Sequence, residues 1–195
     1  MPMPAPSQLE WTAEMARALP EDGNRYEVLD GELLVTPAPS QRHQRAMELL
    51  YLTLAPYARG SRLMHAHFAP CEIEFSATRS VQPDLFVVRL VNGKMPADVE
   101  LPHELLLVVD GLSPATARYD RREKRPLFQS EGVPELWIVD IDARVIERWR
   151  PADERPEVLT ETLSWQPLDD YPALIIDLDV YFADVWEELA GPADA

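Results

Sequence analysis

Two apolar segments in the middle of this 195-residue chain restrict its fold more than any other feature. Residues 84–90 read DLFVVRL and residues 104–110 read ELLLVVD, with few polar residues inside either run. A strand with one face in water alternates between apolar and polar residues, whereas a nearly continuous apolar run is typical of a strand buried on both faces. We therefore expect two neighbouring strands at the centre of a sheet that has helices on its flanks.

The segments around this pair contain both helix and hairpin patterns. Helices are predicted over residues 7–19, 40–58, 113–132 and 179–190. Hairpins are predicted over residues 26–39, turning at Asp30-Gly31, and over residues 134–151, turning at Asp142-Ala143. Further strands are expected over residues 68–76 and 157–160. Because hairpins alternate with helices, we predict a mixed sheet flanked by helices, an α/β (mixed α+β) arrangement, and not a purely parallel doubly wound sheet.

Capping residues and prolines indicate where the predicted helices begin and end. The predicted N-cap residues are Ser7, Ser40 and Asp179. Gly132 suits the position just after the helix over residues 113–132. Pro56 is expected to mark the end of the helix over residues 40–58. Pro126 lies inside the later helix, where a proline removes a backbone hydrogen bond and introduces a kink.

The length and composition favour one soluble domain over residues 1–195. Residues 1–7 are rich in proline and are expected to be disordered. No apolar run approaches the length of a membrane span, and the first residues lack the pattern of a secretory signal. The single cysteine, Cys71, cannot form an internal disulfide, which fits a reducing compartment. We therefore predict a cytoplasmic protein with no membrane segment.

The charge of the chain is strongly negative but unevenly distributed. The formal net charge is -16, and residues 151–195, an acidic extension expected to contain a strand and a helix, hold 12 acidic residues and one base. A negative charge opposes nucleic-acid binding, because contacts with phosphates need Lys and Arg. Five bases nevertheless fall within eight residues: Arg118, Arg121, Arg122, Lys124 and Arg125. A solvated helix face is the commoner use of such a cluster, so its position decides how much it matters.

Three side chains on consecutive predicted elements form a candidate catalytic site. Asp84 opens the first apolar strand, and Asp110 closes the second. If the two strands pair antiparallel, the two carboxylates meet at one end of the sheet, where they need a cation or a raised pKa. Lys124 shares one helix stripe with apolar Leu127 and Phe128, so it is expected to point toward the sheet. Two acids and an amine in this arrangement suffice for metal-assisted phosphodiester cleavage.

Each of these residues also has an ordinary structural explanation. Asp84 could simply begin a strand after Pro83, and Asp110-Gly111 matches a tight-turn dipeptide. Lys124 could pair with Asp120 one helical turn earlier, a contact worth only ~0.3 kcal/mol on an exposed face. The joint placement of the three residues, and no single one of them, carries the functional prediction.

Several segments of the chain resemble the Uma-type family of restriction endonuclease-like proteins, within the PD-(D/E)xK nuclease superfamily. The resemblance covers about residues 24–150 and is carried by RYEVLDGELLVTPAPSQRHQR, VQPDLFVV, LLLVVDGLSPATARYDRREKRPLF and GVPELWIVDIDARVIERWR. The family implies a nuclease-like core with a mixed sheet between helices. It also implies Mg²⁺-dependent (or Mn²⁺-dependent) cleavage of DNA, and a homodimer is expected on the same ground.

The resemblance also suggests roles for individual residues. Asp84 matches the PD aspartate, Asp110 matches the second acid, and Lys124 matches a lysine that has moved to the following helix. Glu32 matches an additional acid beside the metal, and His43 matches an accessory histidine. Taken singly, Glu32 resembles an ordinary exposed strand residue, and a histidine such as His43 near a helix start more often packs or lies on the surface.

The chain departs from the family pattern next to its second acid. The family usually has glutamate followed by a branched apolar residue, whereas this chain has Asp110-Gly111, and aspartate is one methylene shorter. Together with Pro126 and the net charge of -16, this supports an alternative reading, a non-catalytic nuclease-fold module for binding or assembly with a degenerate site. Hydrolysis of another phosphoester is a third reading, which keeps the site and changes the substrate.

Overall fold

The computed structural model describes residues 10–98, 100–113 and 116–187. In chain order the elements are α1 (Ala13–Arg17), β1 (Arg25–Leu29), β2 (Glu32–Thr36), α2 (Gln41–Ser61), β3 (Met64–Phe68), β4 (Ile73–Ser76), β5 (Arg79–Val81), β6 (Leu85–Arg89), the 3₁₀ turn η1 (Leu101–Glu104), β7 (Leu105–Gly111), α3 (Ala117–Tyr119), the π-helical turn η2 (Asp120–Lys124), α4 (Arg125–Ser130), β8 (Leu136–Asp140), β9 (Val145–Trp149), β10 (Glu157–Leu159), β11 (Thr162–Trp165), β12 (Leu174–Asp177) and α5 (Leu178–Val185).

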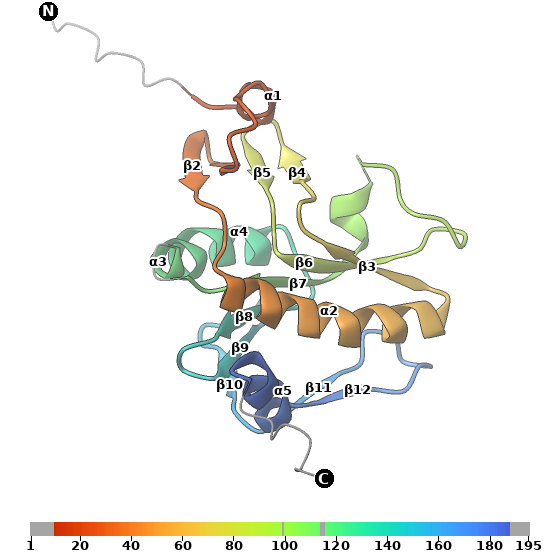
Figure 1. The fold of residues 1–195 in the computed structure, drawn as a ribbon. Helices are drawn as coiled ribbons and strands as arrows, with labels where there is room; N and C mark the ends of the chain where they lie inside the picture. Colours follow the sequence, from red (N-terminus) through yellow and green to blue (C-terminus); the bar gives the residue numbers. More distant parts are fainter. Residues whose placement is uncertain (1–9, 99, 114–115, 188–195) are drawn as a thin grey trace, which may run out of the picture.

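The described strands form three sheets, of which the largest carries the two apolar runs. Its order is β10-β9-β8-β7-β6-β3, so β6 and β7 lie inside it, as predicted. The pair β7–β8 is parallel and the other pairs are antiparallel, which confirms a mixed sheet. A four-stranded sheet, β2-β1-β5-β4, and the pair β11–β12 complete the set. In Figure 1 the four-stranded sheet lies above the six-stranded sheet and β11–β12 lies below it.

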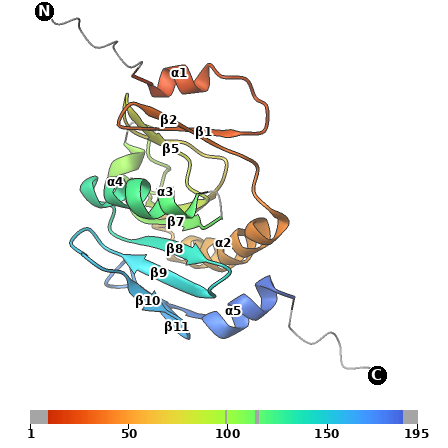
Figure 2. The ribbon, with the colours of Figure 1, turned by 90° about the vertical axis from the view of Figure 1, so that its left-hand side faces the viewer.

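Apolar side chains pack on both faces of the six-stranded sheet. Leu107 and Val109 of β7 belong to a cluster that includes residues of α2 and α5, whereas Val108 packs in a second cluster with Leu127 and Phe128 of α4. Figure 2 shows α2 on one side of β7 and β8 and the α3–α4 segment on the other. Every residue of β7 is buried, so alternate residues serve opposite cores and no polar alternation is needed.

The hairpins and the second helix follow their local sequence signals. Asp30 (φ +47°) and Gly31 (φ +80°) both have left-handed backbones, as the two-residue turn between β1 and β2 requires. The Ser40 hydroxyl accepts the backbone N–H of His43 at 3.2 Å, so the predicted N-cap of α2 is confirmed. The predicted end at Pro56 is wrong, because α2 continues to Ser61. Burial of Ala58 against the sheet compensates for the one backbone hydrogen bond that the proline removes.

The two other predicted caps have different outcomes. Helix α1 begins at Ala13, and the Thr12 hydroxyl accepts the backbone N–H of Met15 at 3.3 Å; the predicted cap, Ser7, lies outside the described residues. Helix α5 is capped by Asp177 and not by Asp179, since the Asp177 carboxylate accepts the backbone N–H of Val180 at 3.0 Å. Of the strands, β3, β5, β11 and β12 were not predicted. No helix in the described part of the chain has the length and apolar character needed to cross a bilayer.

Candidate active site

The register of β6 and β7 brings Asp84 and Asp110 together. Leu85 pairs with Val109 in this antiparallel ladder, so the residue before β6 lies beside Asp110. The two carboxylates are held by reciprocal backbone contacts. The N–H of Asp84 donates to Oδ1 of Asp110 at 3.3 Å, and the N–H of Gly111 donates to Oδ2 of Asp84 at 2.9 Å. Both acids are buried, 5 % and 3 % exposed, and these bonds fix their orientation.

Lys124 reaches the same site from the π-helical turn η2. Its Nζ lies 2.9 Å from Oδ2 of Asp110 and 3.1 Å from Oε1 of Glu27. Burial alone would lower the pKa of Lys124, but the carboxylates of Asp110, Glu27 and Asp120 outweigh burial and raise it. The amine is therefore a fixed positive charge inside the protein. Removing it would leave the buried carboxylates of Asp110 and Glu27 without this cation.

The π-helical turn η2 explains how the helical segment continues from Lys124 past Pro126 without a break. The backbone N–H of Arg125 donates to the carbonyl of Asp120, five residues earlier. Pro126, the second residue of α4, has no N–H to donate back to this turn. The Arg121 carbonyl, five residues earlier, instead accepts a hydrogen bond from Nε of Arg125 at 3.0 Å. The predicted kink thus takes the form of a π-turn, a feature that is frequent at functional sites, and it leaves both Asp120 and Lys124 facing the site.

The second acid that contacts Lys124 is Glu27, and it was missed in the sequence. Glu27 is 2 % exposed, and its carboxylate also accepts the backbone N–H of Gln82 at 2.7 Å. The predicted residue, Glu32, opens β2, is exposed, and does not line the cavity that holds Asp84 and Asp110. A usable signal was present, because charged residues at positions 25 and 27 point to the same face of a strand.

Arg25, on β1, is the second cation of the site, and its side chain is partly buried. Its Nη2 donates to Oδ1 of Asp84 at 2.8 Å, and its Nη1 donates to the carbonyl of Gln82 at 2.9 Å. Burial by itself raises the pKa of Asp84, but the contacts with His43, Arg25 and the Gly111 N–H lower it well below its usual value. Burial raises the pKa of Asp110, although Lys124 opposes that shift. The pKa values of these neighbouring carboxyls are thus pushed apart, as is common in acid–base sites.

His43 lies against Asp84 because Gly111 leaves room for it. His43 is 8 % exposed and its Nε2 lies 2.9 Å from Oδ2 of Asp84, although neither ring nitrogen has a partner in hydrogen-bond geometry among the described residues. A Cβ on Gly111 would lie 2.9 Å from Cε1 of His43 and 3.0 Å from Cε of Met47. The glycine that departs from the family pattern is therefore the residue that admits the imidazole.

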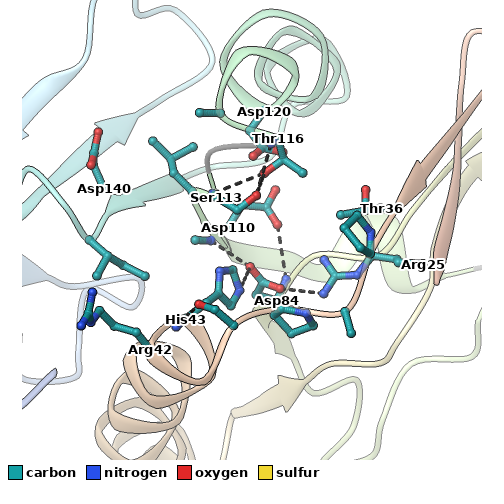
Figure 3. Close-up of a pocket in the computed structure, with 18 of the residues that line it drawn as sticks. Arg25, Thr36, Arg42, His43, Asp84, Asp110, Ser113, Thr116, Asp120 and Asp140 are labelled. Carbon is teal, nitrogen blue, oxygen red and sulfur yellow. Dashed lines mark hydrogen bonds and ion pairs between the residues drawn. The ribbon is translucent and has the colours of Figure 1, made fainter. Parts of the chain in front are cut away.

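A fourth acid, Asp120, was named in the sequence only as a possible partner of Lys124. It is 5 % exposed, and Figure 3 shows it above Asp110, next to Thr116. Burial raises the pKa of Asp120 to about 7, with Lys124 opposing the shift and Asp110 adding to it. Near neutral pH this carboxyl is therefore divided between its charged and uncharged forms.

The raised pKa of Asp120 predicts a pH-dependent stability of the metal-free protein. The unfolded chain loses this proton near pH 3.8 and the folded protein near pH 7. Between these values the folded state binds more protons, so the free energy of unfolding should fall with rising pH, by up to about 1.4 kcal/mol per pH unit. Urea titrations across this range should show that decline, and Asp120→Asn should flatten it. The exposed Asp169→Asn is the matched control, and an unchanged slope in Asp120→Asn would contradict the assignment.

These residues surround a cavity of about 710 Å³ that is lined by parts of β1, α2, β7, α3 and η2 and by the β2–α2 and β8–β9 connections. Of the five clustered bases, Lys124 alone is among the described lining residues. Arg121 instead pairs with Asp140 and Glu147, at 2.8 and 2.6 Å. Most of the basic cluster thus serves the outer surface of this segment. Arg42, from the first turn of α2, does line the cavity (Figure 3).

The charges of the site are suited to a divalent cation. Four acids, Glu27, Asp84, Asp110 and Asp120, are buried around two permanent cations, the buried Lys124 and the partly buried Arg25. The carboxylates outnumber these cations once Asp110 and Asp120, whose pKa values are raised, have lost their protons. The described residues contain no cluster of three or more His, Cys, Asp or Glu spaced around a common metal position. That fits zinc poorly, whereas Mg²⁺ is usually held by one or two carboxylates together with waters and substrate phosphates.

Comparison with known proteins places this arrangement in a family. The model of the Uma2 family, described as "Putative restriction endonuclease", matches residues 13–180. The crystal structure of a "putative nuclease belonging to DUF820" from Anabaena variabilis is similar, with a TM-score of 0.70 and 18 % identity over 89 % of this chain and 98 % of that one. No curated protein matches the chain. The structural likeness confirms the nuclease-like fold, and the family match, which covers most of the sequence, shows that this chain belongs to the Uma2 family.

Proposed function

We propose that this protein is a metal-dependent endonuclease that hydrolyses phosphodiester bonds in DNA. The observation that carries the proposal is the meeting of Asp84, Asp110 and Lys124 in one cavity. These residues come from three separate elements, and burying several carboxylates together is unfavourable unless cations or protons compensate their charge. The family description supports a nuclease activity in general.

In the proposed site, Asp84 and Asp110 hold Mg²⁺ or Mn²⁺. The bound ion would supply a water of lowered pKa and polarise the phosphoryl oxygens. Lys124 would donate a hydrogen bond to the scissile phosphate as negative charge builds up on its oxygens, or would orient the attacking water. Glu27 takes the place that the sequence prediction gave to Glu32, because it is the buried acid that contacts Lys124.

The other polar groups would position these residues. Arg25 and His43 contact the two oxygens of Asp84, so they fix the orientation of its carboxylate. The Thr36 hydroxyl lines the cavity and has no hydrogen-bond partner among the described residues. That oxygen is buried, whereas Arg42 is exposed at the cavity wall, where its guanidinium lies 3.8 Å from the centroid of the Trp186 ring. A substrate would therefore meet the side chain of Arg42 and not the hydroxyl of Thr36.

Cleavage of plasmid and single-stranded DNA with Mg²⁺ or Mn²⁺ tests the proposal. Asp84→Asn and Asp110→Asn should each lower the rate at least about 100-fold, because losing one charged group of this kind commonly costs that much. The exposed Asp169→Asn should cut like the wild type. Equal rates in all four proteins would overturn the site assignment. Cleavage of bis(p-nitrophenyl) phosphate without cleavage of DNA would favour the phosphoester reading.

A parallel comparison of two glutamates separates the sequence prediction from the structure. Glu27→Gln should reduce cleavage strongly, since it removes a charge that contacts Lys124, whereas the exposed Glu32→Gln should leave cleavage nearly unchanged. The measurement is the single-turnover rate on the same plasmid. A larger loss in Glu32→Gln than in Glu27→Gln would return the metal-side role to Glu32.

A second candidate function is a non-catalytic binding or assembly module. It is favoured by the fact that Arg25, His43 and the Gly111 N–H already contact both oxygens of Asp84. Calorimetric titration with Mg²⁺ and Mn²⁺ distinguishes the two functions. An endonuclease should show binding that Asp84→Asn and Asp110→Asn abolish, whereas the module should show no binding that depends on these residues.

A further inference from the structure

The edge of the six-stranded sheet at β3 is open and apolar. Among the described strands, β3 pairs with β6 alone, so one side of its backbone has no strand partner. Three large apolar side chains are strongly exposed around this edge: Leu52 (58 %), Leu63 (52 %) and Phe68 (43 %). Exposed apolar edges of this kind pair readily with another chain, and soluble proteins usually cover or charge them.

A groove runs between α2 and this edge. Two hollows of about 670 Å³ and 290 Å³ share four lining residues, Tyr51, Ala55, Arg59 and Arg62, so they form one continuous depression, here called the α2–β3 groove. No described acidic residue lines it. The groove is remote from the active site, because Arg59 lies 16 residues after His43 along α2, which is about 24 Å at 1.5 Å per residue. Figure 1 shows this end of α2 on the opposite side of the molecule from α3.

The outer stripe of α2 along this groove is complementary to itself. Glu48, Leu52, Ala55 and Arg59 follow one another at spacings of four, three and four residues, so they share one helix face. Glu48 and Arg59 are exposed, and in the described part of the chain neither side chain makes an ion pair or a hydrogen bond. The stripe has an acid at one end, apolar residues in the middle and a base at the other end. Two such stripes laid antiparallel therefore place each acid beside a base and apolar residues beside apolar residues.

We propose that a second copy of this chain docks on the α2–β3 groove through a two-fold axis. Antiparallel packing of two α2 stripes places Glu48 of each copy beside Arg59 of the other, and Leu52 of each copy beside Ala55 of the other. A two-fold interface repeats every contact, as an isologous dimer requires. Helix α2 also runs alongside β3, as the contact between Tyr51 and Phe68 shows, with ring centroids 5.6 Å apart.

The observations favour a second copy over an anionic partner such as nucleic acid. Arg59 and Arg62 would suit phosphates. In the same stripe, however, Glu48 would repel a phosphate, and the exposed Leu52 would gain no favourable contact from one. The second copy uses all of these side chains. This inference does not depend on the proposed cleavage, because association is measured without substrate or metal.

Charge reversal tests the interface. Sedimentation equilibrium of the wild type should give twice the mass of one chain. Glu48→Arg and Arg59→Glu should each weaken self-association at least about tenfold, because each turns two attractive contacts into repulsive ones. An equimolar mixture of these two variants should regain the dimer mass, since every cross-copy pair is again one acid and one base. Leu52→Asp should dissociate the dimer alone and in any mixture.

Controls keep the experiment decisive. Ile175→Asp changes an equally exposed apolar residue on β12 (60 % exposed) and should leave the dimer mass unchanged. Thermal melts check that each variant is folded. A wild type that stays monomeric, or variants that dimerise as well as the wild type, would overturn the proposal. Two monomeric variants that fail to associate when mixed would do the same. Binding of DNA by a monomeric wild type that Arg59→Glu abolishes would assign the groove to nucleic acid instead.

Discussion

Lys124→Met should lower the free energy of unfolding at neutral pH by about 3–5 kcal/mol, the usual cost of breaking a buried ion pair from one side. The amine of Lys124 is buried and contacts the carboxylates of Asp110 and Glu27 at 2.9 and 3.1 Å. Methionine fills a similar volume but leaves both acids without a cation. The loss should be measured by urea denaturation, and the same variant should lose DNA cleavage.

This chain offers a close control for that variant. Lys94 is its only other lysine and it is exposed, so Lys94→Met should change stability by no more than about 0.5 kcal/mol. The deficit of Lys124→Met should also shrink in mildly acidic buffer, because Asp110, whose pKa is already raised by burial, then takes up a proton and loses its need for a cation. Equal stability of the two variants at neutral pH would show that Lys124 does not neutralise the site.

Gly111→Val should destabilise the protein by about 1–3 kcal/mol, the typical cost of overpacking a core, and should sharply reduce cleavage. The added Cβ would lie 2.9 Å from Cε1 of His43 and 3.0 Å from Cε of Met47. Because the surrounding strand is buried, the imidazole must move away from Asp84, where it now lies 2.9 Å from the carboxylate. Restoring the residue type that the family usually has at this position should therefore damage this particular chain.

A double-mutant cycle distinguishes this packing from a general intolerance of β7. Gly111→Ala should show a smaller loss than Gly111→Val, and adding His43→Ala to Gly111→Val should recover much of the stability, because the ring that causes the clash is gone. The coupling energy between the two positions should then be of the order of 1 kcal/mol or more. Strictly additive losses would mean that Gly111 is required for a reason other than the seat of His43.

Cleavage by the same set of variants tests the role of His43. If the imidazole positions Asp84, the double variant should fold well but remain slow, since the cavity regains its packing without regaining the contact with Asp84. A double variant that is both stable and fully active would show that His43 only fills space in this chain. Either outcome helps to decide whether Asp110-Gly111, the departure from the family pattern, indicates a degenerate site.

Several parts of the site could be predicted because they depend on local pattern. The apolar runs around Asp84 and Asp110 admit few folds other than buried central strands, and an antiparallel pair of such strands places their acids together. The stripe of Lys124, Leu127 and Phe128 indicated that the lysine faces inward, and the structure buries all three. These predictions rest on periodicities of two and about four residues, which the sequence displays directly.

Other parts could not be predicted, because they depend on contacts between distant elements. Glu27 and Glu32 are both acids in one hairpin. Contacts with Lys124 of η2 and with the Gln82 N–H accompany the burial of Glu27, whereas Glu32 on β2 stays exposed. Asp177 and Asp179 are equally good caps, and the end of β12 decides between them. The seat of His43 beside Gly111 joins residues 68 positions apart.

The sequence by itself determined the mixed, helix-flanked sheet and the pairing of Asp84 with Asp110, because burial on both faces and strand alternation are encoded residue by residue. Only the tertiary structure decided which glutamate and which cations complete the site, how a π-turn accommodates Pro126, and that Gly111 makes room for an imidazole. Those outcomes depend on shape and on the mutual desolvation of charges, which exist only once separate segments have packed together.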